Sequence, residues 1–280
     1  MEIPFTKLHG NGNDFILVDE YLGYIIPDEM KGEFARLYCD RRFGIGADGV
    51  LYLSLAPSKN LKMRLFQPDE SEAEMCGNGL RCFAKYAYDN RYTREKCTVE
   101  TPVGLIEVQM GYVDDHFSAT IRMPDPEFDR PKIPAKGKGD YVEEIADYTV
   151  YAVNVGVPHA VVFVHELAEV PVAQIAPIIR HHPTFSKGAN VNFVEVDSEN
   201  NLHIRTYERG VEDETMSCGT GATASAAVAH RLGYPGVDGK AYMGKEVHVL
   251  TKGGSVTVRL GDETTLEGPA VTVFSGIISF

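Results

Sequence analysis

Two short segments of this 280-residue chain carry the residue types best suited to chemistry. The first, Ala73–Gly79, reads Ala-Glu-Met-Cys-Gly-Asn-Gly, and the second, Thr215–Gly221, reads Thr-Met-Ser-Cys-Gly-Thr-Gly. Their cysteines, Cys76 and Cys218, lie half a chain length apart, and each loop runs directly into a helical pattern. This recurrence predicts an internal repeat of domain size, with one copy of the loop in each half.

A cysteine followed by Gly-x-Gly at the start of a helix offers an anion-binding site and a reactive group together. The first N–H groups of the helix and the positive end of its dipole bind a carboxylate or phosphate, and the glycines let the ligand approach the backbone. The same position favours a thiolate, so we expect the pKa of each loop thiol to fall below about 8.5. Each loop therefore predicts one anion-binding site and one activated thiol.

If both loops serve one cleft, a carboxylate would lie between two helix N-termini with a thiol on either side. Two such thiols could remove a proton from one face of an amino-acid α-carbon and return one to the other face. A rate gain of even ~10⁶ requires about 8 kcal/mol of stabilisation of the carbanion. One helix end supplies about 0.3–2 kcal/mol, and one oxyanion-type donor about 2.7–4 kcal/mol. We therefore expect several donors to converge on the carboxylate.

Three other interpretations explain less of the pattern. Gly219–Ala224 with Asp238 fits a loose dinucleotide fingerprint, but that motif needs a preceding strand, and residues 210–215 have the composition of a polar loop. A cysteine hydrolase with a histidine partner leaves the second loop unexplained. A non-catalytic amino-acid-binding module would need the anion-binding loops but not two thiols.

The remaining cysteines are expected to be small buried residues: Cys39, Cys82 and Cys97.

The composition restricts partners and location. The length predicts two domains, and the net charge of −13 argues against nucleic acid or an anionic membrane surface as a partner. We expect no transmembrane helix and no signal peptide. Five cysteines, an odd number without a Cys-x-x-Cys pair, favour the reducing cytoplasm and argue against structural zinc. No nucleotide or phosphate motif indicates a cofactor, so we expect neither a cofactor nor a metal.

Most of the chain reads as short β-branched and aromatic runs between turn residues, which is typical of strands. The proline-rich stretch Met123–Pro134 is expected to cross between the domains. Helical spacing appears in four segments: Glu29–Cys39, Leu80–Asn90, Val172–His181 and Ala222–Leu232. The expected strands are Phe15–Val18, Leu61–Phe66, Leu105–Gln109, Tyr148–Asn154, Ala160–Val164, Val191–Val196, Leu202–Tyr207, Glu246–Thr251 and Ser255–Leu260.

At its loops and along its whole length, the sequence resembles the diaminopimelate epimerase family, cofactor-independent enzymes of lysine and peptidoglycan precursor synthesis. The resemblance rests on the order and spacing of several motifs: His9–Phe15, Arg42–Gly49, Ser71–Cys82, Asn154–His159, Ala189–Phe193, Tyr207–Gly221 and Gly268–Ala270.

This resemblance implies an α+β fold of two pseudo-symmetric domains, each a β-sheet barrel wrapped around a central helix. It implies one domain from residues 1–121 plus 266–280 that carries Cys76, and another from residues 122–265 that carries Cys218. It also implies a homodimer that acts on a small molecule, while the composition predicts a cytoplasmic protein with no nucleic-acid or membrane partner.

The resemblance also implies roles for individual residues. Cys76 would be the base for LL-diaminopimelate and Cys218 the acid that gives the meso product, with the roles exchanged in reverse. His159 and Glu208 match positions that tune the two thiols. The carboxylate-binding positions are matched by Gly77, Asn78, Gly79, Gly219, Thr220 and Gly221, and other substrate-binding positions by Asn13, Gln67, Asn190, Glu208 and Arg209. Arg209 resembles the partner of the distal carboxylate, a role suited to a bidentate guanidinium.

Three positions depart from the family pattern. Gln67 and Val157 stand where the family commonly has asparagine, near the far end of the substrate. An unpaired buried substrate group would cost about 1–3 kcal/mol there, so these changes leave open a different amino-acid substrate. Phe274 stands where some members have a tyrosine at the dimer contact. A related racemase of the proline racemase type is the alternative, although such enzymes usually have histidine where this chain has Asn78.

Overall fold

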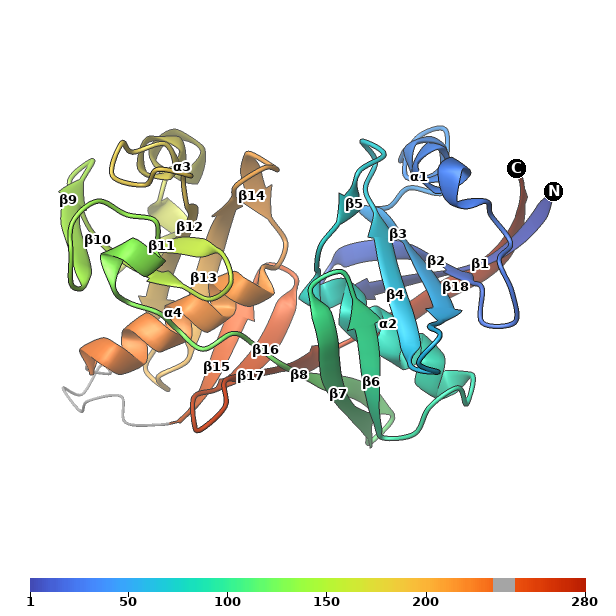
Figure 1. Cartoon of the computed structure of the whole chain (residues 1–280). Coiled ribbons are helices and arrows are strands. Elements are labelled where there is room, and N and C mark those ends of the chain that lie inside the picture. The colour runs from blue at the N-terminus through green and yellow to red at the C-terminus, as the bar shows by residue number, and fades with distance from the viewer. Residues whose placement is uncertain (234–244) are drawn as a thin grey trace. The chain divides into compact units, whose positions relative to one another are not determined.

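The computed structural model describes residues 1–233 and 245–280 and divides into two compact units. The first unit comprises Met1–Ile121 and Glu267–Phe280, and the second comprises Arg122–Leu266 (Figure 1). The chain therefore passes between units twice, at the end of one strand and within another. Asp238, part of the dinucleotide alternative, lies outside the described residues.

The first unit places one helix, α2, among its strands, and a second helix, α1, against the outer face of the sheet. Its elements are β1 (Glu2–Gly10), β2 (Asn13–Asp19), the 3₁₀ turn η1 (Asp28–Met30), α1 (Lys31–Tyr38), β3 (Gly49–Leu55), β4 (Leu61–Phe66), β5 (Glu72–Ala73), α2 (Gly77–Asp89), β6 (Lys96–Thr101), β7 (Gly104–Val113), β8 (His116–Arg122) and β18 (Val271–Ser279).

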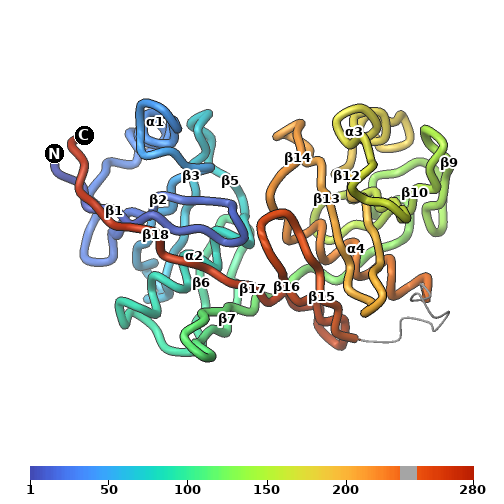
Figure 2. Tube along the Cα trace, turned by 180° about the vertical axis from the view of Figure 1, so that it is seen from behind, coloured from blue at the N-terminus to red at the C-terminus, as the bar shows by residue number. Residues whose placement is uncertain are grey.

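The strands of the first unit pair in a defined order. β18 pairs antiparallel with β1, β1 antiparallel with β2, β2 parallel with β3, and β3 antiparallel with β4. β4 also pairs parallel with β6, and β6, β7 and β8 follow as antiparallel neighbours. α2 packs against β18, β1, β2, β3, β4 and β7, so strands from the whole order surround it. The chain ends meet here: β1 and β18 run side by side, and the Met1 amino group donates to the Phe280 carbonyl at 2.6 Å (Figure 2).

The second unit repeats this plan with α4 as its inner helix and α3 as its outer helix. Its elements are the 3₁₀ turn η2 (Arg130–Lys132), β9 (Tyr141–Ile145), β10 (Tyr148–Asn154), β11 (Pro158–Phe163), the 3₁₀ turn η3 (Leu167–Glu169), α3 (Val172–Arg180), β12 (Asn190–Val196), β13 (Leu202–Glu208), β14 (Asp213–Thr215), α4 (Gly219–Leu232), β15 (Glu246–Thr251), β16 (Gly254–Arg259) and β17 (Thr265–Pro269), whose last residues belong to the first unit.

The two units share one pairing pattern, which confirms the internal repeat. β9 and β10 are antiparallel, β10 and β11 antiparallel, β11 and β12 parallel, and β12 and β13 antiparallel, as for β18 to β4. β13 pairs parallel with β15, and β15 antiparallel with β16, as for β4, β6 and β7. α4 is buried without interruption from Gly221 to Ala229, and its small residues let the strands pack closely around it.

The strand predictions at Leu61–Phe66, Tyr148–Asn154 and Glu246–Thr251 match β4, β10 and β15 to the residue. The polar loop expected over residues 210–215 is partly wrong, because Asp213–Thr215 pairs with β13 and forms β14. Both loop helices start three residues earlier than their apolar spacing indicated, at the first glycine after each cysteine. Within the described residues, we find no helix that is long and apolar enough to span a membrane.

Candidate functional site

The Cys76 loop forms the N-terminus of α2. Cys76 has extended backbone angles (φ −145°, ψ 113°) and is the N-cap residue, and its Sγ accepts a hydrogen bond from the Gly79 N–H at 3.4 Å. A side chain on Gly79 would approach Leu51 Cδ2 at 3.3 Å and Phe15 Cζ at 3.5 Å. The glycine therefore allows the cap to pack closely against the neighbouring strands while the thiol stays beside the first turn.

Asn13 links the Cys76 loop to a charged network. The Cys76 thiol donates to Asn13 Oδ1 at 3.5 Å, and Asn78 Nδ2 donates to the same oxygen at 3.2 Å. Asn13 Nδ2 in turn donates to Asp48 Oδ2 at 2.6 Å. The structure thus brings together three of the predicted site residues of this unit: Cys76, Asn78 and Asn13.

The charges beside Asn13 are paired with one another. Arg41 donates to both Asp14 and Asp48 at 2.7 Å, and Lys7 donates to Asp14 at 2.7 Å. Burial opposes ionisation of Asp14, but the hydrogen bonds and charges of Arg41 and Lys7 outweigh it and hold the pKa of Asp14 well below its usual range. Asp48 is thereby fixed in place as the acceptor for the Asn13 amide.

The Cys218 loop repeats the cap geometry in the second unit. Cys218 is the N-cap residue of α4 (φ −125°, ψ 111°), and its Sγ accepts from the Gly221 N–H at 3.4 Å and lies 3.3 Å from Thr220 Oγ1. A Cβ at Gly221 would lie 2.5 Å from Asn192 Oδ1, a distance that the packing excludes. Glycine is therefore required here for close approach.

Cys218 corrects the expectation of a lowered thiol pKa. Burial raises the pKa of Cys218 well above its ordinary value, and the negative charge and hydrogen bond of Glu208 raise it further. Hydrogen bonds from Thr220 and the Gly221 N–H act in the opposite direction but are weaker. At neutral pH Cys218 is a protonated thiol beside a carboxylate.

His159 is completely buried on β11, with a side-chain amide at each ring nitrogen. Asn192 Nδ2 lies 3.0 Å from Nδ1 and Asn190 Nδ2 lies 3.4 Å from Nε2. Asn192 also donates to the Ala160 carbonyl and accepts from Thr206 Oγ1, so its NH₂ group faces Nδ1, which must be the acceptor. Burial and the Arg209 charge lower the pKa of His159 to about 3, so the imidazole is neutral at physiological pH.

Arg209 lies beside the same group of residues. Its backbone N–H donates to Asn190 Oδ1 at 2.7 Å, and its guanidinium donates to the Lys187 carbonyl at 3.1 Å. Asn190 is the register partner of His159 on the parallel strands β11 and β12. The second unit therefore connects Asn190 to both His159 and Arg209, and Cys218 to both Glu208 and Thr220.

Three other predicted positions lie away from these contacts. Gln67 is in the exposed turn after β4, where its side chain accepts from Ser71 Oγ at 3.2 Å. Val157 is half-buried in the turn between β10 and β11, and Phe274 is 47% exposed on β18. This contact does not join Gln67 to the Cys76 loop, so its substrate-binding role stays a prediction.

The sequence predicts no role for three residues that support these contacts: Asp48, Asn192, and Arg81, which donates to Asn78 Oδ1 at 2.9 Å. Asp48 and Arg81 lie inside motifs that carry the resemblance, but Asp48 accepts from Asn13 and Arg81 donates to Asn11, both far away in sequence. For Asn192 a signal was present, because Asn190 and Asn192 alternate along a strand and so share one face.

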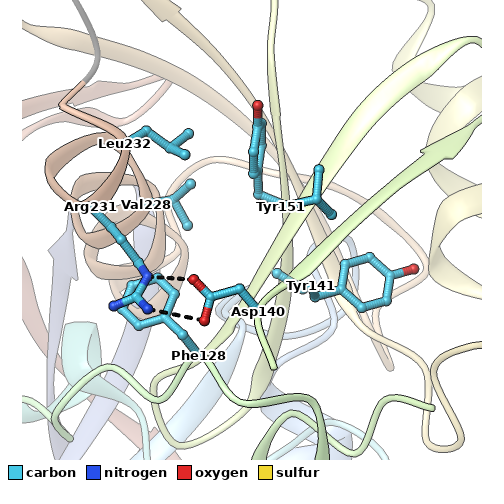
Figure 3. A pocket seen from close by; sticks show the side chains of 9 residues that line it. Phe128, Asp140, Tyr141, Tyr151, Val228, Arg231 and Leu232 are labelled. Carbon is cyan, nitrogen blue, oxygen red and sulfur yellow. Dashed lines mark hydrogen bonds and ion pairs between the residues drawn. The ribbon is translucent and has the colours of Figure 1, made fainter. Parts of the chain in front are cut away.

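Among the described residues, neither a group of metal ligands nor the cavity discussed below involves these side chains. Across residues 1–233 and 245–280, no three His, Cys, Asp or Glu side chains are grouped to hold a metal ion. A cavity of about 390 Å³ in the second unit includes Asp140, Tyr141, Val228 and Arg231 in its lining (Figure 3). Arg231 donates to both Asp140 oxygens at its rim, and none of the predicted site residues lines this cavity.

Comparisons with known proteins point to one family. A family model described as diaminopimelate epimerase matches residues 5–127 and 151–274. The protein named diaminopimelate epimerase in Methanothrix thermoacetophila is 51% identical over 280 residues, which cover 99% of this chain and 96% of the relative. The one in Methanocella arvoryzae is 49% identical over 281 residues, with coverage of 99% and 97%.

A solved structure shows the same fold. The Bacillus anthracis phenazine biosynthesis protein of the PhzF family superposes with a TM-score of 0.72, and the match covers 100% of both chains at 17% identity. Together with the repeated strand order, this likeness confirms the predicted α+β class.

Proposed function

Because the chain belongs to the diaminopimelate epimerase family, we propose that it converts LL-2,6-diaminopimelate to meso-diaminopimelate by proton transfer between two cysteines, without a cofactor. Membership makes the chain an isomerase of the racemase and epimerase class. The observation that carries the two-cysteine part is the duplicated cap: Cys76 and Cys218 are each the N-cap residue of an inner helix, with extended backbone angles and a 3.4 Å hydrogen bond from the N–H three residues later.

In the forward direction Cys76, as a thiolate, takes the α-proton of the LL substrate. The Cα–H bond breaks, an S–H bond forms at Cys76, and the electron pair remains on the α-carbon and its carboxylate. Cys218 then gives its proton to the opposite face, so a new Cα–H bond forms and Cys218 becomes a thiolate. The raised pKa of Cys218 supports this role, because the thiol holds its proton until the carbanion develops.

The two helix N-termini are proposed to bind the α-carboxylate. Backbone N–H groups there are fixed by the helix and need no reorganisation as charge develops, which is the physical basis of oxyanion-type stabilisation. Several donors at about 2.7–4 kcal/mol each would reach the ~8 kcal/mol that a 10⁶-fold acceleration needs. The proposed donors come from the first turns of α2 and α4: Gly77, Asn78, Gly79, Gly219, Thr220 and Gly221.

The other end of the substrate is proposed to meet Asn13, Gln67, Asn190, Glu208 and Arg209. Arg209 would hold the distal carboxylate through its guanidinium. Its backbone N–H already fixes Asn190, and Asn190 Nδ2 lies 3.4 Å from His159 Nε2, so the distal group and the neutral imidazole would be positioned by neighbouring residues. His159 and Glu208 are proposed to adjust the proton affinity of the two thiols.

Supporting features extend the proposal beyond the reaction. The exposed apolar side chains of β18 suit a homodimer contact, and they are Val271, Val273, Phe274 and Ile277. The five cysteines are not joined in disulfides, which fits a reducing cytoplasm. We further propose a role in the synthesis of lysine and peptidoglycan precursors.

The decisive experiment follows LL-diaminopimelate in D₂O by proton NMR under reducing conditions. We expect loss of the α-proton signal together with appearance of the meso isomer. Exchange of other L-amino acids but not of diaminopimelate would favour the related racemase. Binding of diaminopimelate without any exchange would favour the binding module and would reject the catalytic proposal.

Variants test the two thiols separately. We expect neither Cys76→Ala nor Cys218→Ala to form the meso isomer. Cys97→Ala is a matched control, since Cys97 is a half-buried cysteine on β6 outside the loops. Normal turnover by Cys76→Ala would reject the two-cysteine mechanism.

A further inference from the structure

Arg81, on the second turn of α2, is a buried cation that has no carboxylate partner among the described residues. Its side chain is 0% exposed, and it donates to neutral oxygens: Asn11 Oδ1 at 2.8 Å, Asn78 Oδ1 at 2.9 Å and the Pro269 carbonyl at 3.2 Å. Its Nη1 has no hydrogen-bond partner within the part of the chain that the structure describes. Burying a charge in this way costs free energy that an apolar side chain would not.

The local backbone accommodates this guanidinium specifically. A Cβ at Gly10 would lie 3.2 Å from Arg81 Nη2 and 3.1 Å from the Asn78 carbonyl. Gly10 therefore leaves room for the guanidinium beside the first turn of α2. Packing alone does not explain a buried charge without a counter-ion in a site that fits its side chain. This arrangement therefore indicates a functional role for the guanidinium.

Arg81 ends a directed chain of two amides. A guanidinium only donates, so Asn78 Oδ1 must face it and Asn78 Nδ2 points to Asn13. At the other end Asp48 only accepts, so Asn13 Nδ2 faces Asp48 and Asn13 Oδ1 points back. Both amides are thus fixed in one orientation, and Asn13 Oδ1 is held as the acceptor beside the Cys76 thiol.

The charge of Arg81 also acts on Cys76 directly. Burial lowers the pKa of Arg81 below its ordinary value, while negative charge on Cys82 and Cys76 raises it again. This coupling is reciprocal: if a Cys76 thiolate stabilises the guanidinium, the guanidinium stabilises the thiolate. In a water-poor interior this interaction is stronger than at the surface.

We propose that Arg81 is a positioning residue for Cys76. Its buried charge favours the Cys76 thiolate, while its hydrogen bond to Asn78 fixes the amide chain whose Asn13 Oδ1 accepts from Cys76 when the thiol is protonated. The inference rests on the proposed function, because it assumes that Cys76 accepts the substrate proton. It assigns no substrate contact to Arg81. The other charged or titratable groups around the α2 N-terminus and the amide chain are Lys7, Asp14, Arg41, Asp48, Cys82 and Lys85.

The test measures the rate of Cys76 alkylation by iodoacetamide against pH, with the modified Cys76 peptide resolved by mass spectrometry. Arg81→Gln keeps a hydrogen-bond donor but removes the charge, and we expect the midpoint of its rate profile to move up by about one pH unit. That shift is an approximately tenfold loss of rate below the midpoint. Arg81→Lys keeps the charge, and we expect its profile to stay near that of the wild type.

Asn11→Asp provides a second route if the Arg81 variants do not fold. It replaces a neutral oxygen 2.8 Å from Nη2 by a carboxylate and so neutralises the guanidinium in place. Asn11 has φ +51°, a conformation that aspartate tolerates as asparagine does. We expect the same upward shift as for Arg81→Gln.

Lys85→Gln is the matched control. It removes a cation one turn further along α2 that is paired with Asp89 at 2.8 Å, and we expect no shift in the Cys76 profile. An unchanged midpoint in folded Arg81→Gln or Asn11→Asp protein would overturn the proposal, as would equal shifts in Arg81→Gln and Arg81→Lys. Because alkylation needs no substrate, the shift can be found even if diaminopimelate is not turned over. In that case the proposed function fails and the effect on the thiol stands.

Discussion

Acidification should destabilise this protein through His159, whose ring is completely buried and neutral. The pKa of His159 is lowered to about 3 by burial and by the Arg209 charge, against an ordinary value of 6.5 in an unfolded chain. Between these two values the unfolded state binds a proton that the folded state does not. Stability from this group is therefore fully present above pH 6.5 and is lost progressively as the pH falls toward 3.

The size of the loss follows from the two pKa values. One pH unit below 6.5, protonation of the imidazole lowers the free energy of the unfolded state by about 1.4 kcal/mol, while the folded state gains almost nothing. Lowering the pH from 7.5 to 5.5 should therefore reduce the free energy of unfolding by about 1.4 kcal/mol through His159. The full difference would approach about 5 kcal/mol near pH 3.

The assay is urea unfolding of the wild type and of His159→Gln at both pH values. The variant lacks the titrating ring, so the pH-dependent loss in the wild type should exceed that in the variant by about 1.4 kcal/mol. His116→Gln is the matched control, because His116 is exposed on β8 and its imidazole is solvated in both states. It should show the same loss as the wild type.

A direct reading of the imidazole complements the unfolding data. The ring resonances of His159 in a proton–carbon NMR spectrum should not move between pH 7.5 and 5.5 in the folded protein. A titration midpoint near 6.5 would refute the reasoning, as would equal pH-dependent losses in the wild type and His159→Gln. Either result would mean that water or a nearby anion stabilises the imidazolium.

Two further substitutions test the Cys218 loop. Gly221→Ala places a Cβ 2.5 Å from Asn192 Oδ1 and should destabilise the protein by about 1–3 kcal/mol in thermal or urea unfolding. Gly111→Ala is the control, because its Cβ meets no atom within 4 Å, and it should change the free energy of unfolding by less than about 0.5 kcal/mol. Glu208→Gln removes the negative charge that helps to raise the pKa of Cys218, so this pKa should fall. The measurement is a titration of thiolate absorbance near 240 nm, with Cys218→Ser as the reference. A rise or no change in the pKa would contradict the electrostatic account.

Much of the fold could be predicted because its strands carry local patterns. β4, β10 and β15 are short runs bounded by turn residues, and their ends were predicted correctly. β17 could not be found in this way, since Gly268 and Pro269 within Thr265–Pro269 have turn chemistry and only tertiary pairing makes them part of a strand. β14 was missed for the same reason, because its pairing with β13 decides its conformation.

The site was predictable in its residue types but not in its connections. The cap position of each cysteine follows from local sequence, and both caps are present as the loops indicated. The partners of Asn13 are distant in sequence, and so are Asn11 and Pro269, which accept from Arg81; only the contact of Arg81 with Asn78 follows from helical spacing. The pKa of Cys218 was predicted in the wrong direction because the helix N-terminus contributes about 1 kcal/mol, whereas complete burial and an adjacent carboxylate contribute more.

The two halves of the repeat therefore differ in charge while they agree in shape. The Cys76 loop has the buried cation Arg81 behind it, and the Cys218 loop has the carboxylate of Glu208 beside it. A nearby cation favours a thiolate, and a nearby anion favours a protonated thiol. Two caps of similar geometry can therefore start a reaction in different roles, with Cys76 as the base and Cys218 as the acid. If the proposed mechanism holds, one turnover leaves Cys76 protonated near Arg81 and Cys218 ionised beside Glu208. Each thiol is then in the state that the neighbouring charge disfavours. Return of the proton to Cys218 is then downhill, which restores the enzyme for the next LL substrate.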